Sequence, residues 1–132
     1  MLSSSLNKSL YWLSRNVYHE ARGEPNKGIK AVSKCVITRA ITRKQTIKEV
    51  ILQPYQFEWT LMDNLRTLPI TEFNQESYHH CRNLIIDAID EYLNGDTNQM
   101  ADHYFNYHLV NPPWAEKMTK IATIGNHVFY RE

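Results

Sequence analysis

The spacing of apolar residues changes along the chain, and this change constrains the fold more than any other feature of the sequence. Over residues 6–21, apolar side chains recur every three or four positions, which predicts an amphipathic helix ending near Gly23. The same spacing predicts a second helix over about 26–41, packed against the first. A third helix of about twenty residues is predicted to include residues 78–92 and to end at Gly95.

Two segments between these helices are shorter or less regular. Thr46 and Glu49 have the spacing of a capping box, so we expect a short helix to open there, to run through Leu52 and to be closed by Pro54. Residues 54–73 are aromatic and polar with no clean period. We expect a long loop there.

The last third of the chain has the features of a small β-sheet. Residues 103–107 are rich in β-prone side chains. The pair Gly125-Asn126, between residues 121–124 and 127–130, is typical of a two-residue hairpin turn with glycine first. Helices first and a sheet last indicate an α+β fold, and we expect one domain over residues 1–132 with a cleft between two lobes.

Composition and charge exclude several classes of protein. Hydrophobic residues make up 42% of the chain, and four Gly and five Pro among 132 residues argue against a disordered or collagen-like chain. Residues 1–66 hold eleven Lys and Arg against five acids, whereas residues 67–132 hold four against nine. A basic half could bind an anionic partner such as nucleic acid or a cell-wall glycan, or its basic residues could simply be solvated on helix faces. Charge alone does not distinguish these interpretations.

The sequence has no motif for a cofactor or a metal. Its six His form no ligand set with Cys, and it lacks a nucleophile elbow, a phosphate loop and a dinucleotide glycine pattern, so we expect neither cofactor nor metal. Cys35 and Cys81 lie in apolar helical patterns, where buried reduced thiols are the commoner outcome. No apolar run reaches the ~18 residues of a membrane span, and the N-terminus lacks a secretory signal pattern.

The segment from Tyr18 to Pro25 holds the candidate acids. Glu20 lies at the end of the first predicted helix near its buried side, where burial would raise the pKa of the carboxyl as a general acid requires. Surface pairing of Glu20 with Arg22 or another cation is the alternative that spacing alone allows. Glu24 could be a second glycosidase carboxylate, but its place before Pro25 favours capping of the next helix.

Aromatic and amide side chains supply candidate ligand contacts. Sugar faces stack on aromatic rings while amides bond hydroxyl and acetamido groups, and stacking suits single-stranded nucleic acid equally. Core packing is expected for at least half of these rings. The candidates are Gln56, Phe57, Trp59, Tyr104, Asn106, Tyr107, Trp114 and Tyr130.

Four blocks of the sequence resemble the SleB-type cell wall hydrolases, a family named for the spore-cortex-lytic enzyme and shared by small phage lysins. The first block is Tyr-His-Glu-Ala-Arg-Gly-Glu-Pro at 18–25, and the last is Ile-Gly-Asn-His-Val-Phe-Tyr-Arg at 124–131. Between them lie matches at 47–59 and 103–106. Tyr107 departs from the pattern, since many relatives have Pro there, so we expect a different loop path after Asn106.

The resemblance implies a two-lobed, lysozyme-like fold, mostly helical with a small antiparallel sheet. It implies that Glu20 is the acid/base of a lytic transglycosylase that cuts peptidoglycan between N-acetylmuramic acid and N-acetylglucosamine, leaving 1,6-anhydro ends. Arg22 and Glu24 would support the site, and Arg22 would orient the motif loop by pairing with a carboxylate. A water-using muramidase is the alternative, and a non-catalytic glycan- or nucleic-acid-binding module a more remote one. The expected substrate contacts are Gln56, Phe57, Trp59, Tyr104, Asn106, His127 and Tyr130.

The expected biological setting is a small phage endolysin. We expect a monomer without a separate wall-binding domain, which binds peptidoglycan strands and no nucleic acid and does not insert stably into a membrane. It would be made in the host cytoplasm without a signal peptide and would reach the cell wall through a holin. A bare catalytic domain of this kind suits the thin wall of a Gram-negative host.

Overall fold

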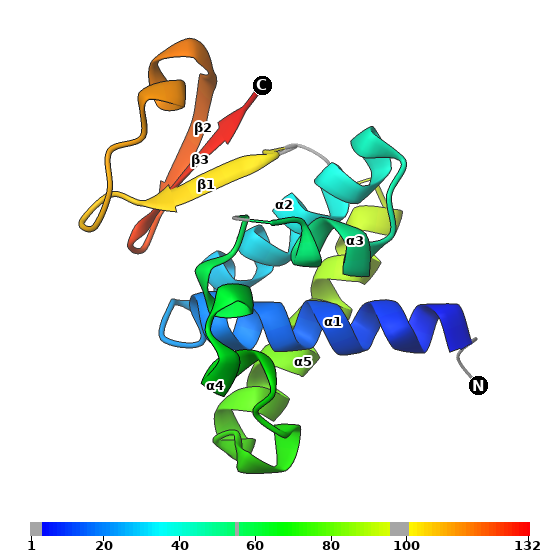
Figure 1. The fold of residues 1–132 in the computed structure, drawn as a ribbon. Coiled ribbons are helices and arrows are strands. Elements are labelled where there is room, and N and C mark those ends of the chain that lie inside the picture. Colours follow the sequence, from blue (N-terminus) through cyan, green and yellow to red (C-terminus); the bar gives the residue numbers. More distant parts are fainter. Residues whose placement is uncertain (1–3, 55, 96–100) are drawn as a thin grey trace.

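Helices form one lobe and a small sheet the other in the computed structural model, which describes residues 4–54, 56–95 and 101–132 (Figure 1). The first part of the segment examined for a signal, residues 1–3, lies outside the described residues. The fold class predicted from the sequence is confirmed. The longer elements of the helical lobe are α1 (Ser4–Ala21), α2 (Asn26–Arg43), α3 (Ile47–Leu52) and α5 (Gln75–Leu93).

Local signals account for the ends of three helices. The capping box of α3 is confirmed, because Thr46 Oγ1 accepts from the Glu49 backbone N–H and Glu49 Oε1 accepts from the Thr46 N–H, both at 3.1 Å. Helix α5 begins after Asn74, whose Oδ1 accepts from the Ser77 N–H at 2.9 Å. Helix α2 extends past the predicted end at 41, since Lys44 takes a positive φ of 54° and its N–H caps the last turn.

The expected loop over 54–73 contains three short helical turns, so that prediction is wrong in detail. They are η1 (Glu58–Leu61), α4 (Asp63–Arg66) and η2 (Ile70–Glu72). The buried Arg15 of α1 holds this segment, because its Nη2 lies 2.7–2.9 Å from the carbonyl oxygens of Leu65, Arg66 and Leu68. A contact spanning some fifty residues leaves no local period in the sequence.

The sheet is antiparallel with the order β1-β3-β2. Its strands are β1 (His103–Asn106), β2 (Thr119–Ile124) and β3 (His127–Arg131). Gly125 has a φ of +58° at the first turn position between β2 and β3, which confirms the predicted glycine-first hairpin. Because side chains alternate along a strand, Tyr104 and Asn106 face the helices with their partners on β3, while Phe105 and Tyr130 lie on the outer face.

One hydrophobic core joins both lobes. It contains apolar residues of the four longer helices, and Ile124 and Phe129 of the sheet pack into it. Cys35 and Cys81 are buried free thiols, as expected, and burial raises the pKa of the Cys35 thiol to about 12. None of the described helices combines the length and apolar character that crossing a bilayer requires.

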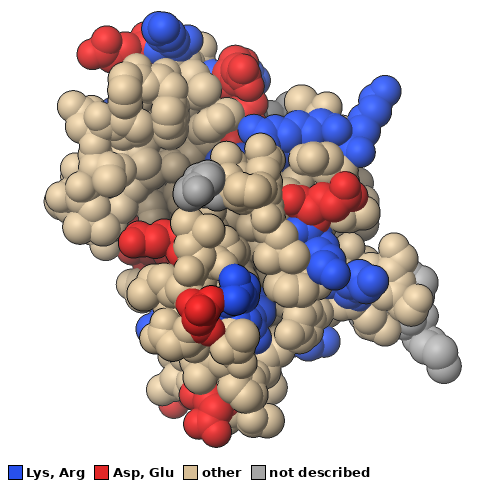
Figure 2. All heavy atoms as spheres, viewed as in Figure 1, with Lys and Arg blue, Asp and Glu red and all other residues tan. Residues whose placement is uncertain are grey.

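The charge asymmetry of the two sequence halves is partly neutralised by folding. Lys30 and Lys34 of α2 lie 2.7 and 2.8 Å from the carboxylate oxygens of Glu91 on α5. On the face shown in Figure 2, positive and negative side chains are interspersed. This face therefore offers no single-sign patch for a polyanion.

Candidate active site

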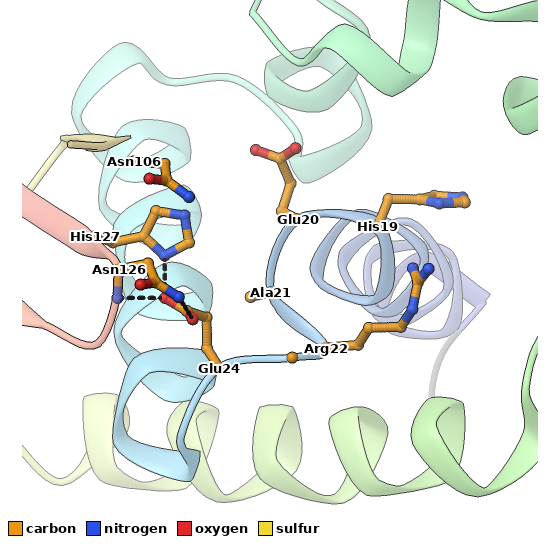
Figure 3. A pocket seen from close by; sticks show the side chains of 9 residues that line it. His19, Glu20, Ala21, Arg22, Glu24, Asn106, Asn126 and His127 are labelled. Atoms are coloured by element: carbon orange, nitrogen blue, oxygen red, sulfur yellow. Dashed lines mark hydrogen bonds and ion pairs between the residues drawn. The ribbon is translucent and has the colours of Figure 1, made fainter. Parts of the chain in front are cut away.

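A cavity of about 360 Å³ lies where the end of α1 meets the sheet (Figure 3). The Glu20 carboxylate and the Asn106 amide point toward it from opposite lobes, whereas the His19 and Arg22 side chains point away from that carboxylate (Figure 3). The lining residues are His19, Glu20, Ala21, Arg22, Gly23, Glu24, Asn106, Asn126 and His127.

Glu20 is half-buried in the last turn of α1. Burial raises the pKa of its carboxyl above the ordinary value, and the Glu58 charge acts weakly in the same direction. A hydrogen bond of 2.7 Å that Tyr104 donates to Glu20 Oε1 opposes the increase, as does the charge of Arg39. Burial also keeps the pKa of Tyr104 well above its usual range, so this hydroxyl remains a donor. Glu20 is thus a positioned carboxyl whose environment favours the protonated form.

Arg22 makes no pair with Glu20 among its described contacts, which corrects the expectation of a surface ion pair between these two residues. Its Nη1 donates to the Tyr18 carbonyl oxygen at 3.0 Å, and its guanidinium lies 4.4 Å from the centre of the Tyr18 ring. The expectation that Arg22 orients the motif loop by pairing with a carboxylate is likewise not met. Arg22 instead braces the last turn of α1.

Glu24 does not cap α2, which corrects the prediction from its place before Pro25. Helix α2 has no side-chain cap. Glu24 Oε1 accepts from the Asn126 backbone N–H and Glu24 Oε2 from Asn126 Nδ2, both at 2.9 Å. His127 Nδ1 also lies 2.9 Å from Glu24 Oε1 (Figure 3). Both carboxylate oxygens are therefore engaged in holding the β2–β3 turn against the loop after α1.

The two histidines of the cavity favour the neutral form. Burial lowers the pKa of His127, and the Glu24 carboxylate offsets only part of the effect. Burial and the charges of Arg15 and Arg22 lower the pKa of His19 to about 4. The His19 ring stacks on Trp59, with a centroid distance of 4.7 Å. At neutral pH the two imidazoles of the cavity-lining histidines are thus uncharged.

Two predicted substrate contacts line the cavity, and a third, which is outside the lining set, contacts Glu20. Tyr104 reaches Glu20, and Asn106 and His127 line the cavity wall. Asn106 Oδ1 accepts from the His108 backbone N–H at 2.9 Å, which leaves the amide nitrogen on the side nearer to Glu20 (Figure 3). Gln56 is exposed outside the lining set, where its Oε1 accepts from Arg39 at 3.3 Å.

Phe57 and Trp59 belong to the core, and the structure does not support their predicted role as substrate contacts. Each exposes 3% of its surface. Trp59 Nε1 donates to the buried Asn16 Oδ1 at 2.7 Å, and Phe57 lies under the Arg39 guanidinium. Both rings are packed inside the protein, and the polar group of Trp59 has its hydrogen-bond partner there, so their role is structural.

Tyr130 is also placed away from Glu20. It lies on the outer face of the sheet, because it alternates with Phe129, which packs into the core. Asn126 and His19 also line the cavity, although no sequence pattern predicts a site role for them. The sequence predicts Asn126 only as a residue of the hairpin turn, and it marks His19 only as a member of the Tyr18–Pro25 segment.

One cluster of metal-ligand side chains occurs elsewhere among the described residues. Ligand atoms of Asp102, His103 and Glu132 lie within 4.8 Å of one another at the start of β1 and the end of β3. Asp102 Oδ1 already contacts His103 Nδ1 at 2.8 Å and accepts from the Glu132 N–H at 3.0 Å. These contacts account for the cluster without an ion, and Glu132 is exposed.

Comparison with known proteins identifies the family to which this arrangement belongs. A family model described as Cell Wall Hydrolase matches residues 23–130. The chain belongs to the cell wall hydrolase family. Glu20 lies just before the matched residues.

Curated relatives with similar sequences include spore cortex-lytic enzymes. The Bacillus subtilis (strain 168) enzyme is 28% identical over 125 residues, covering 93% of this chain and 37% of that enzyme. The Halalkalibacterium halodurans enzyme is 30% identical over 120 residues, covering 89% of this chain and 33% of that enzyme. The chain therefore spans little more than a third of the length of these relatives.

Two solved structures share the fold of this cell wall hydrolase. The catalytic domain of the germination-specific lytic transglycosylase SleB from Bacillus anthracis aligns with a TM-score of 0.73 and 27% identity, covering 98% of this chain and 97% of that one. The catalytic domain of the Bacillus cereus SleB protein aligns with a TM-score of 0.74 and 27% identity, covering 95% and 91%. The lysozyme-like fold expected from the sequence is confirmed.

Proposed function

We propose that this protein cleaves the glycan strand of peptidoglycan between N-acetylmuramic acid and N-acetylglucosamine as a lytic transglycosylase. Family membership and the likeness to SleB, whose catalytic domain is described as a lytic transglycosylase, support the substrate and the reaction class. The observation that carries the assignment is Glu20, a half-buried carboxyl with a raised pKa at the edge of an open cavity. Such a group can donate a proton at neutral pH.

The reaction begins with Glu20 protonated. Its carboxyl proton moves to the glycosidic oxygen as the bond from that oxygen to the muramyl C1 breaks, and the substrate's acetamido group stabilises the oxocarbenium-like centre. The Glu20 carboxylate then accepts the proton of the muramyl 6-hydroxyl while O6 bonds to C1. The products are a free 4-hydroxyl on N-acetylglucosamine and a 1,6-anhydro-muramic end. Glu20 is protonated again.

The engagement of Glu24 supports a mechanism with a single carboxylate. A retaining glycosidase needs a second carboxylate free to attack the sugar, and an inverting one needs a second carboxylate free to activate water. Among the residues that line the cavity, Glu24 is the only other acid, and Asn126 and His127 occupy its oxygens. Tyr104 orients Glu20 Oε1, and the Asn106 amide is placed to bind a substrate acetamido or hydroxyl group.

The test is mass spectrometry of fragments released from purified Gram-negative peptidoglycan. Wild-type protein should release muropeptides with anhydro-muramic ends, and Glu20→Gln should release none. Glu72→Gln, which changes an exposed glutamate outside the cavity, is the matched control and should behave as wild type. Circular dichroism of each variant checks that the fold is retained.

The other outcomes distinguish the alternatives. Reducing muramic ends that depend on Glu20 would identify a water-using muramidase. Full activity of Glu20→Gln would remove Glu20 from the mechanism. Absence of fragments from the wild type, together with salt-sensitive binding of a single-stranded oligonucleotide, would favour a nucleic-acid-binding module.

The biological role we propose is that of an endolysin that acts on the cell wall after release by a holin. The resemblance of the sequence to small phage lysins carries this part of the proposal. Expression in a Gram-negative host with and without a co-expressed holin tests it. Lysis should require both proteins and should be lost with Glu20→Gln, and size-exclusion chromatography should give a monomer.

A further inference from the structure

A second cavity, of about 640 Å³, opens on the face of the sheet that points away from the helices. In Figure 1 the α-helices lie to one side of the sheet only, which leaves this outer face to the chain segment between β1 and β2, including the short 3-10 helix η3 (Pro113–Lys117). The lining residues are Phe105, Tyr107, Val110, Asn111, Lys120, Thr123, Val128 and Tyr130.

Aromatic rings form the floor of this outer cavity. Phe105 and Tyr130 are stacked, with ring centroids 5.6 Å apart and planes 14° apart. Trp114 meets both rings edge-on, at 5.5 and 5.9 Å. Phe105 and Tyr130 line the cavity and give it an aromatic, apolar wall against which a sugar ring can pack.

The rim adds the polar groups that a glycan with peptide stems requires. Tyr107 is 45% exposed, and Asn111 and Thr123 supply an amide and a hydroxyl. Lys120 is the only charged residue among the described lining residues, and it is exposed. An ammonium group at this place complements a carboxylate, which peptide stems carry and a neutral glycan lacks.

The outer cavity adjoins the Glu20 cavity at the end of β1. Asn106 lines the first cavity and Tyr107, the next residue, lines the second. The Tyr107 N–H donates to the Asn126 carbonyl oxygen at 3.3 Å, and Asn126 lines the Glu20 cavity. A polymer that leaves the first cavity over this edge would reach the second.

We propose that the outer cavity binds a further disaccharide-peptide unit of the same peptidoglycan strand, remote from the bond that is cleaved. A sugar ring stacks on the Tyr107 and Tyr130 rings, and a carboxylate of the peptide stem pairs with Lys120. This inference rests on the proposed substrate. Single-stranded nucleic acid fits less well, because a phosphate backbone requires a row of cations and the described lining has one.

The experiment is an NMR titration of the full chain carrying Glu20→Gln, which allows binding without cleavage. The probes are a soluble disaccharide-tetrapeptide and chitotetraose, which lacks carboxylates. We expect the disaccharide-tetrapeptide to shift the amide signals of Lys120, Thr123 and Val128. Adding Lys120→Gln should weaken this binding about fivefold, as expected for an exposed ion pair, and leave chitotetraose unaffected.

Further variants separate stacking from charge. Tyr107→Ala should weaken the binding of both probes. Tyr107→Phe should bind them as tightly as the parent, because it keeps the ring. Lys117→Gln is the matched control, since Lys117 is an exposed lysine outside the lining set. In the active protein, Lys120→Gln and Tyr107→Ala should raise KM for polymeric peptidoglycan and leave kcat unchanged.

The proposal is overturned if the outer-face amides do not respond to the disaccharide-tetrapeptide, or if Tyr107→Ala and Lys120→Gln bind it as tightly as the parent. Both results can occur while the wild type cleaves peptidoglycan, so they are distinct from failure of the proposed function. That failure is read from fragment release alone.

Discussion

Glu24 and Asn126 are joined by two hydrogen bonds of 2.9 Å although 102 positions separate them in the chain. One bond is made to the Asn126 backbone and the other to its side chain, so the carboxylate fixes both the position and the orientation of the β2–β3 turn. The loop that follows Glu20 is thereby attached to the sheet that carries Tyr104 and Asn106. The two walls of the candidate active site depend on this attachment.

The turn beside this attachment has room only for glycine. Gly125 has a φ of +58°, and an added Cβ would lie 2.9 Å from Pro25 Cδ and 3.1 Å from Glu24 Oε1. We expect Gly125→Ala to lower the free energy of unfolding by more than about 1 kcal/mol, measured by urea denaturation. Gly23→Ala is the control, because its added Cβ meets nothing within 4 Å. Equal stability of the two variants would contradict this account.

Loss of the Glu24 charge tests the attachment itself. Glu24→Gln keeps the shape of the side chain but replaces one of its two acceptor oxygens by an amide group. One of the two Asn126 donors, which now each bond to a separate oxygen, then loses its acceptor. We expect a loss of about 1–3 kcal/mol in the free energy of unfolding. Cleavage should fall as well, because Asn106 and Glu20 lose their fixed relation. A Glu24→Gln protein of wild-type stability would show that the contact is dispensable.

We expect Tyr104 to set the pH range over which Glu20, the proposed acid, is protonated. Its hydrogen bond favours the carboxylate and so lowers the Glu20 pKa against the effect of burial. Tyr104→Phe removes this bond, so the Glu20 pKa should rise and the alkaline limb of the pH profile of kcat/KM should move to higher pH. The rate should fall at the optimum, since the carboxyl is less well oriented. An unmoved alkaline limb would separate Tyr104 from the titration of Glu20.

Elements with local signals could be predicted from the sequence. The Thr46–Glu49 capping box and the Gly125-Asn126 turn each involve residues within a few positions, and the apolar periods of α1 and α5 depend on spacing alone. Glu20 was located in the same way, from a helix end and from the resemblance of the segment around it. The structure places it at the cavity.

The remaining features depend on contacts between distant residues. The sequence around Trp59 predicts a substrate contact, but its indole N–H donates inside the core to Asn16, which lies 43 positions earlier in the chain. The position of Glu24 before Pro25 predicts a helix cap, but in the folded protein its two oxygens accept hydrogen bonds from Asn126 in the distant β2–β3 turn. Tyr130 shares a strand with His127, and only the register shows that they face opposite sides. Local patterns carry no information on these pairings.

The raised pKa of Glu20 also makes a prediction about stability. A carboxyl whose pKa is higher in the folded state binds its proton more tightly there, so folding loses stability as pH rises from the ordinary value of 4.5 through the folded pKa. Gln at this position does not titrate. Glu20→Gln should therefore become more stable relative to wild type as pH rises, and the difference in free energy of unfolding should stop growing above the folded pKa. Below 4.5 both proteins are uncharged there, and the difference should be smallest. Thermal unfolding of the two proteins across this range measures it. A difference that is constant with pH would mean that Glu20 is ionised as easily in the folded protein as in the unfolded chain, and its assignment as the acid would lose its physical basis.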